Sequence, residues 1–119
     1  MLTLPPSVRV FVAVEPTDMR KSFDTLAQLA TEVLKQDPCS GHLFVFSNKR
    51  HDRIKILVWD HSGFWLFAKR LEQGTFTWPS RAQARGASLE LRGEELTLIL
   101  SGIDLRGARP RRWYERASA

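Results

Sequence analysis

The sequence predicts an α+β fold: an antiparallel sheet of four to six strands with one long helix on it, a short C-terminal helix and a basic flexible tail. Two observations predict this fold. An amphipathic helical pattern stands near the N-terminus, and a series of short, β-branched and aromatic runs follows it. The length of 119 residues fits one domain, which we place at 1–105, followed by an arginine-rich arm at 106–119.

The first strand is predicted at 8–14, where VRVFVAV is nearly all apolar and so suits a strand covered on both faces. A helix is predicted at 19–36, because apolar residues recur there every three to four positions. Thr17 and Asp18 are the expected N-cap pair, since short oxygen-bearing side chains accept hydrogen bonds from the first helical N–H groups. Pro38 ends the helix.

Three further strands are predicted at 42–48, 53–59 and 64–70, and the last two are joined by a hairpin turn, DHSG. With His61 and Ser62 at the tip, one face of the hairpin is apolar near the turn and cationic away from it. The pairs on that face are Trp59 with Phe64, Leu57 with Leu66, Lys55 with Ala68, and Arg53 with Arg70. The other face is expected to lie under the helix. It carries Ile54, Ile56, Val58, Trp65 and Phe67.

The C-terminal part is predicted to contain shorter elements. An edge strand at 75–78 stops at a proline, and the small, polar and basic residues 80–87 indicate a loop. A short strand at 89–91 and a helix at 94–100 follow, and two glutamates favour the positive end of that helix. After residue 105 the sequence has little core-forming periodicity, so a flexible arm is expected.

Composition restricts the class of protein. Hydrophobic residues make up 43% of the chain, which suffices for a folded core. The sequence has neither a bilayer-spanning apolar run nor a signal-peptide pattern, and we expect a cytoplasmic protein without a membrane partner. Cys39 is the single cysteine, so no internal disulfide and no cysteine zinc site is expected, and no cofactor is predicted.

The charge is strongly basic, at +5 with 18 Lys and Arg against 13 Asp and Glu. Such a surplus attracts polyanions, and arginine suits bidentate contacts with phosphate. The candidate nucleic-acid-binding residues are Arg20, Lys21, Lys49, Arg50, Arg53, Lys55, Lys69, Arg70, Arg111 and Arg112. Two plainer interpretations stay open: a surface salt network of Asp18, Arg20 and Asp24, and a solvated rim of cations around core aromatics.

Catalytic motifs are missing from the sequence: no nucleophile elbow, no phosphate-cradling glycine loop and no paired metal-binding histidines are present. His42, His51 and His61 are interpreted as surface or hairpin residues. Five aspartates could in principle gather around magnesium with help from Lys55, although cap and turn chemistry explains each of them. They are Asp18, Asp24, Asp37, Asp52 and Asp60. We therefore predict no enzyme and no metal site, with a divalent-metal nuclease as the lesser alternative.

Three long blocks resemble one known family. PTDMRKSFDTLA (16–27), DPCSGHLFVFSNKRHDRIKILVWD (37–60) and GFWLFAKRLEQGTFTWP (63–79), followed by LTLILSGIDL (96–105), are similar to the accessory proteins called TnpB of the IS sixty-six family of insertion sequences. This bacterial family is distinct from the long RNA-guided nucleases of the same name. Thr25 departs from the family, in which a glycine is common at that position.

The resemblance implies a small protein encoded beside a DDE-type transposase and needed, with a further small accessory protein, for efficient transposition. It carries over no catalytic residue. The leading hypothesis is a non-catalytic accessory factor that binds insertion-sequence ends or the transposase–DNA complex. The alternative is an interaction module without DNA contact, which uses Trp59 and Phe64 to bind the transposase or another copy of the chain.

Overall fold

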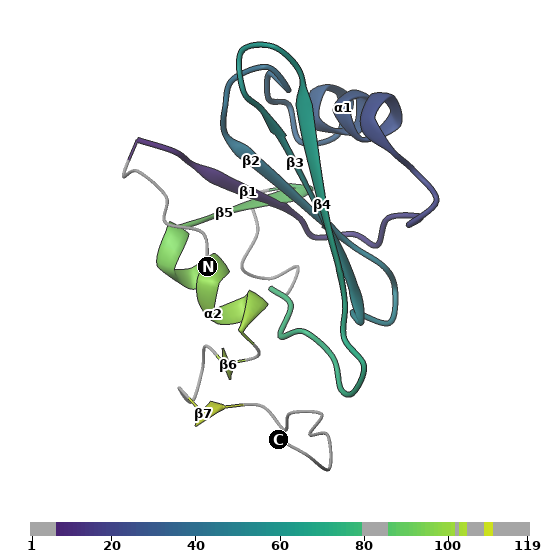
Figure 1. The fold of residues 1–119 in the computed structure, drawn as a ribbon, viewed down its shortest axis with the longest axis vertical. Helices are drawn as coiled ribbons and strands as arrows, with labels where there is room; N and C mark the ends of the chain where they lie inside the picture. Colours follow the sequence, from purple (N-terminus) through teal and green to yellow (C-terminus); the bar gives the residue numbers. More distant parts are fainter. Residues whose placement is uncertain (1–6, 80–85, 102, 105–108, 111–119) are drawn as a thin grey trace.

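The protein is described by a computed structural model, which covers residues 7–79, 86–101, 103–104 and 109–110. A five-stranded sheet in the order β4-β3-β2-β1-β5 forms its centre, and two short strands form a second sheet (Figure 1). The elements are β1 (Val10–Ala13), α1 (Phe23–Glu32), β2 (Leu43–Ser47), β3 (Arg53–Trp59), β4 (Phe64–Arg70), β5 (Ser88–Leu91), α2 (Gly93–Leu100), β6 (Ile103–Asp104) and β7 (Arg109–Pro110).

The predicted fold class, an antiparallel sheet with one long helix packed on it, is wrong. β1 and β2 pair in parallel, with Val10 beside Leu43 and Val12 beside Val45, so the sheet is mixed. The reason is that α1 lies between these two strands in the sequence, and a helical crossover returns the chain to the same end of the sheet. The other neighbours in this sheet are antiparallel.

The helix predicted at 19–36 is only ten residues long, from Phe23 to Glu32. Its N-cap is Ser22, whose N–H donates to Thr25 Oγ1 at 3.0 Å. The predicted caps serve elsewhere: Thr17 is buried, and Asp18 accepts the Arg20 N–H in a local turn that keeps the preceding segment out of the helix.

The C-terminal end of α1 is also earlier than predicted. Lys35 adopts a left-handed backbone with φ of 59°, and the Gln36 N–H returns to the carbonyl of Ala30. Both features are typical of a chain that leaves a helix. The helical spacing of apolar residues therefore continues beyond residue 32, although the helix itself ends there.

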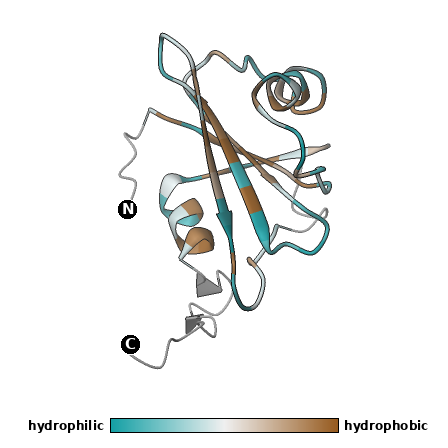
Figure 2. Cartoon of the chain, turned by 45° about the vertical axis from the view of Figure 1, so that its right-hand side comes forward, coloured by the Kyte–Doolittle hydropathy of each residue, from teal (hydrophilic) through white to brown (hydrophobic). Residues whose placement is uncertain are grey.

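Each face of the sheet carries its own core, because successive side chains of a strand point to opposite faces. Three aromatic rings of the strands are buried on the α1 face, and the strand residues buried on the α2 face are aliphatic. Figure 2 shows the two helices on opposite sides of the sheet, whose central strands are largely hydrophobic. The α1 core consists of Phe11, Ala13, Phe44, Phe46 and Leu57 with Leu26, Ala30 and Leu34. The α2 core consists of Val10, Val12, Leu43, Val45, Ile54, Ile56 and Leu91 with Phe76, Leu96 and Ile99.

The hairpin of β3 and β4 has the predicted register, from Arg53 opposite Arg70 to Trp59 opposite Phe64. The predicted packing of its faces is wrong. Leu57 lies under α1, whereas Ile54 and Ile56 belong to the α2 core. Trp65 and Phe67, which were expected in the core, are 56% and 42% exposed. The α2 core takes its strand residues from β1, β2, β3 and β5, so β4 at the sheet edge extends beyond this cover.

The turn of this hairpin is held by Asp60. Its Oδ1 accepts hydrogen bonds from the Ser62 and Gly63 N–H groups at 3.4 and 3.2 Å, and its Oδ2 accepts from Trp65 Nε1 at 2.5 Å. The indole bond is the main reason that the pKa of Asp60 lies below its ordinary value. The turn thus also fixes the orientation of Trp65 on the open strand.

The strand predicted at 75–78 is not formed. Phe76 is buried in the α2 core, its N–H donates to the carbonyl of His51, and Trp78 Nε1 donates to the carbonyl of Ala13. The strand at 89–91 and the helix at 94–100 are confirmed as β5 and α2. Most of the arginine-rich arm lies outside the described residues.

His51 is expected to couple stability to pH. It lies in the β2–β3 turn, stacks on Trp78 at 5.4 Å between ring centroids, and has a pKa lowered from 6.5 by burial. The folded state therefore favours the neutral ring, and its contribution to stability is lost as pH falls below 6.5. We expect the free energy of unfolding to decrease from about pH 7 to pH 5.

The matched variant is His51→Asn, because asparagine tolerates the left-handed φ of 56° at this position and does not titrate. Urea unfolding at each pH is expected to give a flatter pH dependence for this variant. Equal pH dependence in the two proteins would contradict the assignment to His51.

Candidate nucleic-acid interface

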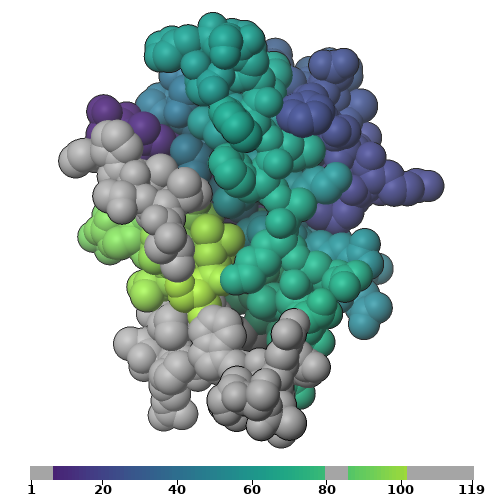
Figure 3. Space-filling model, viewed as in Figure 1, coloured from purple at the N-terminus to yellow at the C-terminus, as the bar shows by residue number. Residues whose placement is uncertain are grey.

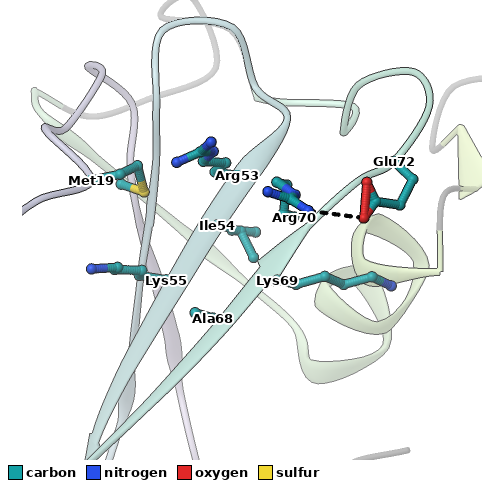
Figure 4. A pocket seen from close by; sticks show the side chains of 8 residues that line it. All are labelled: Met19, Arg53, Ile54, Lys55, Ala68, Lys69, Arg70 and Glu72. Atoms are coloured by element: carbon teal, nitrogen blue, oxygen red, sulfur yellow. Dashed lines mark hydrogen bonds and ion pairs between the residues drawn. The ribbon is translucent and has the colours of Figure 1, made fainter.

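The cations predicted on the hairpin meet at an open hollow of about 400 Å³ on the α1 side of β3 and β4 (Figure 4). Arg53 and Arg70 are directly opposed across the two strands, and Lys55 follows two residues along β3. The residues that line the hollow are Met19, Arg53, Ile54, Lys55, Ala68, Lys69, Arg70 and Glu72. Strand register alone thus brings three of the predicted cations together.

The opposed arginines make this hollow electrostatically unusual. Like charges on directly opposed strand residues destabilise a sheet unless an anion lies between them. Arg70 Nη2 reaches Glu72 Oε1 at 3.1 Å, but both side chains are more than half exposed, so this ion pair is weak. A bound phosphate would relieve the repulsion and accept hydrogen bonds from both guanidinium groups.

Lys55 has a structural role in the hollow. Its Nζ donates to the main-chain carbonyl of Lys21 at 2.8 Å, and the side chain is half-buried. This bond ties the segment before α1 to the centre of β3. Met19, which was predicted as the first residue of the helix, lies in that segment and forms one wall of the hollow (Figure 4).

We expect Lys55→Met to lower the free energy of unfolding by about 1.5 kcal/mol, because it removes a charge-assisted hydrogen bond but keeps the apolar stem. Urea unfolding measures the change. The control is Lys49→Met, at an exposed turn position, with an expected change within about 0.5 kcal/mol. If the two variants are equally stable, the Lys55 bond does not hold the segment.

The cations before α1 only partly join this site. Arg20 Nη2 pairs with Asp18 Oδ2 at 2.7 Å, and this contact lowers the pKa of Asp18 to about 2. The Arg20 side chain is nevertheless 91% exposed, so it can exchange the carboxylate for another anion. Lys21 faces a smaller, mostly apolar hollow beside α1, which Val33 also lines.

Lys49 and Arg50 are exposed at the β2–β3 turn. Asn48 fixes this turn, because its Oδ1 accepts the Asp52 and Arg53 N–H groups at 3.1 Å each and its Nδ2 donates to Asp52 Oδ1 at 2.6 Å. The two cations therefore project from a hydrogen-bonded turn at the end of β3 where Arg53 begins the strand.

Other predicted residues are not part of the hollow's cation cluster. Lys69 also lines the hollow, but its side chain extends away from Lys55 (Figure 4), and its Nζ donates to the Leu100 carbonyl at the end of α2, at 2.7 Å. Trp59 and Phe64 are half-buried in an edge-to-face contact at 5.0 Å. Arg111 and Arg112 lie outside the described residues. Sequence reasoning missed Met19 and Glu72, for which no motif gave a signal.

The aspartates proposed for a nuclease are engaged in turns. The Asn48 amide is the main reason for the lowered pKa of Asp52, and Trp65 has that role for Asp60. Within the part of the chain that the structure describes, no three His, Cys, Asp or Glu side chains gather as metal ligands would. In that same part, neither helix is long and apolar enough to cross a membrane.

Comparison with known proteins shows which protein family the chain resembles. The family model described as "IS66 Orf2 like protein" matches residues 8–110. Uncharacterized protein y4hO of Sinorhizobium fredii (strain NBRC 101917 / NGR234) is 42% identical over 106 residues, which cover 89% of this chain and 90% of the relative. Uncharacterized protein y4jC of the same strain is 37% identical over 97 residues, which cover 82% and 80%. No solved structure matches. The chain belongs to the IS66 Orf2-like family, whose members have an accessory role associated with transposition.

Proposed function

We propose that this accessory protein binds the DNA phosphate backbone through the hollow between β3 and β4. The observation that carries the proposal is the direct opposition of Arg53 and Arg70, with Lys55 beside them. Fold stability gains nothing from two opposed guanidinium groups, whereas a phosphate bridges them well. The exposed cations of the β2–β3 turn extend the positive surface from the same end of β3.

Such a surface recognises backbone charge and gives little sequence discrimination. Within a transposition complex, the DNA bound is proposed to be the insertion-sequence ends, alone or already held by the DDE-type transposase. The further small accessory protein of the element is a second proposed partner. These partners come from the family and from its resemblance to insertion-sequence accessory proteins.

The test is fluorescence anisotropy of a labelled element-end duplex, titrated with the full chain over a series of salt concentrations, alone and with the transposase. We expect binding that weakens linearly in a plot of log affinity against log salt. Three phosphate contacts predict a slope of about −2.7. Absence of binding at low salt in both arms would end the direct-contact proposal.

An interaction module remains the second candidate function, and one observation favours it. Trp65 and Phe67 are exposed and stack on each other at 6.1 Å on the open strand β4. Trp59 and Phe64 are less suited to this role, because their rings contact each other and are half-buried. Co-purification with the transposase that persists at high salt, and is lost in Trp65→Ala, tests this candidate.

A further inference from the structure

Strand β4 forms one edge of the sheet, and no strand of the described residues pairs with its outer side. Its seven residues make it as long as β3, and two exposed aromatic side chains stand near its middle. Figure 3 shows the teal residues of this part of the chain at the surface along much of the molecule. A long edge with exposed aromatic rings is a template for pairing with another strand.

The hydrogen bonds of the hairpin show which groups of β4 point outward. The Asp60 N–H donates to the Gly63 carbonyl, and the Leu71 N–H donates to the Asp52 carbonyl. Hydrogen-bonded and non-hydrogen-bonded pairs alternate in an antiparallel ladder. Residues 65, 67 and 69 therefore bond inward to β3, and the main-chain groups of residues 64, 66, 68 and 70 point outward.

These outward groups fit a second copy of the same strand. We propose that two copies of this chain pair antiparallel through β4, with Phe67 on the two-fold axis. All four outward residues of each strand then have partners, with Phe64 opposite Arg70 of the second copy and Leu66 opposite Ala68. A symmetric pairing of one patch with itself is the commonest arrangement of protein dimers.

Charge complementarity selects this register. Each aromatic residue in the first half of FWLFAKR meets a cation in the second half: Phe64 meets Arg70, and Trp65 meets Lys69 on the other face. Such pairs gain from the attraction between a cation and an aromatic ring. An axis at Lys69 would place the two copies of Lys69 opposite each other. An axis at Ala68 would place Phe64 opposite Glu72, beyond the end of β4. A shift toward Phe64 would leave outward groups of Arg70 unpaired.

This dimer would also place the two proposed phosphate sites on one surface. A two-fold axis perpendicular to a continuous sheet keeps the α1 layers of both copies on the same face. Arg70 lies three residues from the axis in each copy, so the two hollows would be about 20 Å apart along the strands. This last step rests on the proposed function, whereas the pairing of β4 does not.

The test is the mass of the full chain by light scattering across a concentration series. We expect a species of twice the 13.7 kDa of one chain. Ala68→Pro should be monomeric yet folded, because it removes an outward N–H to which no strand of the described residues is paired, and edge strands tolerate proline there. Far-ultraviolet circular dichroism checks the fold.

A cross-link tests the register independently of the proline variant. Exposed Cys39 is first replaced by serine, and Phe67→Cys in that background should form a disulfide-linked dimer on mild oxidation, because opposed non-hydrogen-bonded residues lie about 4.5 Å apart. Ala68→Cys is the matched control. In the proposed register the Cα atoms of the two copies of residue 68 lie about 8 Å apart, which is too far for a disulfide bond.

The possible results separate this proposal from the proposed function. The β4 pairing is overturned if the chain is a monomer at all concentrations. It is also overturned if Ala68→Pro leaves the dimer intact and the dimer cross-links through Ala68→Cys and not through Phe67→Cys. Salt-dependent DNA binding by a monomeric wild-type chain would support the phosphate site and contradict the dimer. A dimer without DNA binding would give the reverse result.

Discussion

Replacing Arg53 and Arg70 together by glutamine is expected to weaken binding to duplex DNA about 60-fold at 0.1 M salt. Each phosphate contact contributes a factor of about 8 at that salt concentration, because each one releases condensed counterions from the duplex. The same change should lower the slope of log affinity against log salt by about 1.8. Anisotropy titrations with element-end DNA measure both quantities.

The control variant loses the same number of positive charges, but at positions away from the hollow. Arg9, directly before β1, pairs with Glu90 on β5, and Arg92 lies at the start of α2. Arg9→Gln combined with Arg92→Gln removes the same two charges, and a reduction of only a few-fold is expected from the smaller overall field. Equal weakening by the two double variants would mean that net charge, and not the hollow, attracts DNA.

The second large effect concerns stability. Phe44→Ala is expected to lower the free energy of unfolding by about 3–5 kcal/mol, the usual cost of removing a buried phenylalanine ring. Phe44 is completely buried on β2 under α1 and stacks on Phe11 at 5.8 Å between ring centroids. Urea unfolding monitored by circular dichroism, at one protein concentration, gives the value.

Phe23→Ala is the matched control, because Phe23 is 44% exposed at the start of α1. Its cost should be under about 1 kcal/mol, as for most surface substitutions. A small effect at Phe44 would mean that α1 does not cover the aromatic face of the sheet. In that case the wall of the hollow formed by Met19 would also be misplaced.

The sequence predicted the local elements well where neighbours along the chain decide them. The Asp60–Gly63 turn sets the register of β3 and β4, and with it the opposition of Arg53 and Arg70. The nearly continuous apolar run of β1 identified a strand buried on both faces. Strand pairing through a short turn is local, so the cation cluster could be predicted in part.

Helix length was harder to predict from spacing. The apolar pattern from Met19 to Leu34 suggests one helix, but the Asp18 turn delays its start and Lys35 leaves it in a left-handed conformation. Leu34 is buried all the same, from the segment after α1. A residue that fits the apolar spacing of a helix can therefore be buried in the core without being part of that helix.

The sequence by itself determined the family, the hairpin register, the strand β5, the helix α2 and the arginines that face each other across two strands. Only the tertiary structure decided which face of the hairpin lies under α1, that β1 and β2 run in parallel, and that Lys55 holds the Lys21 carbonyl. These features depend on contacts between distant segments. Alternation along a strand separates its two faces, but the residues that cover each face come from elsewhere in the chain.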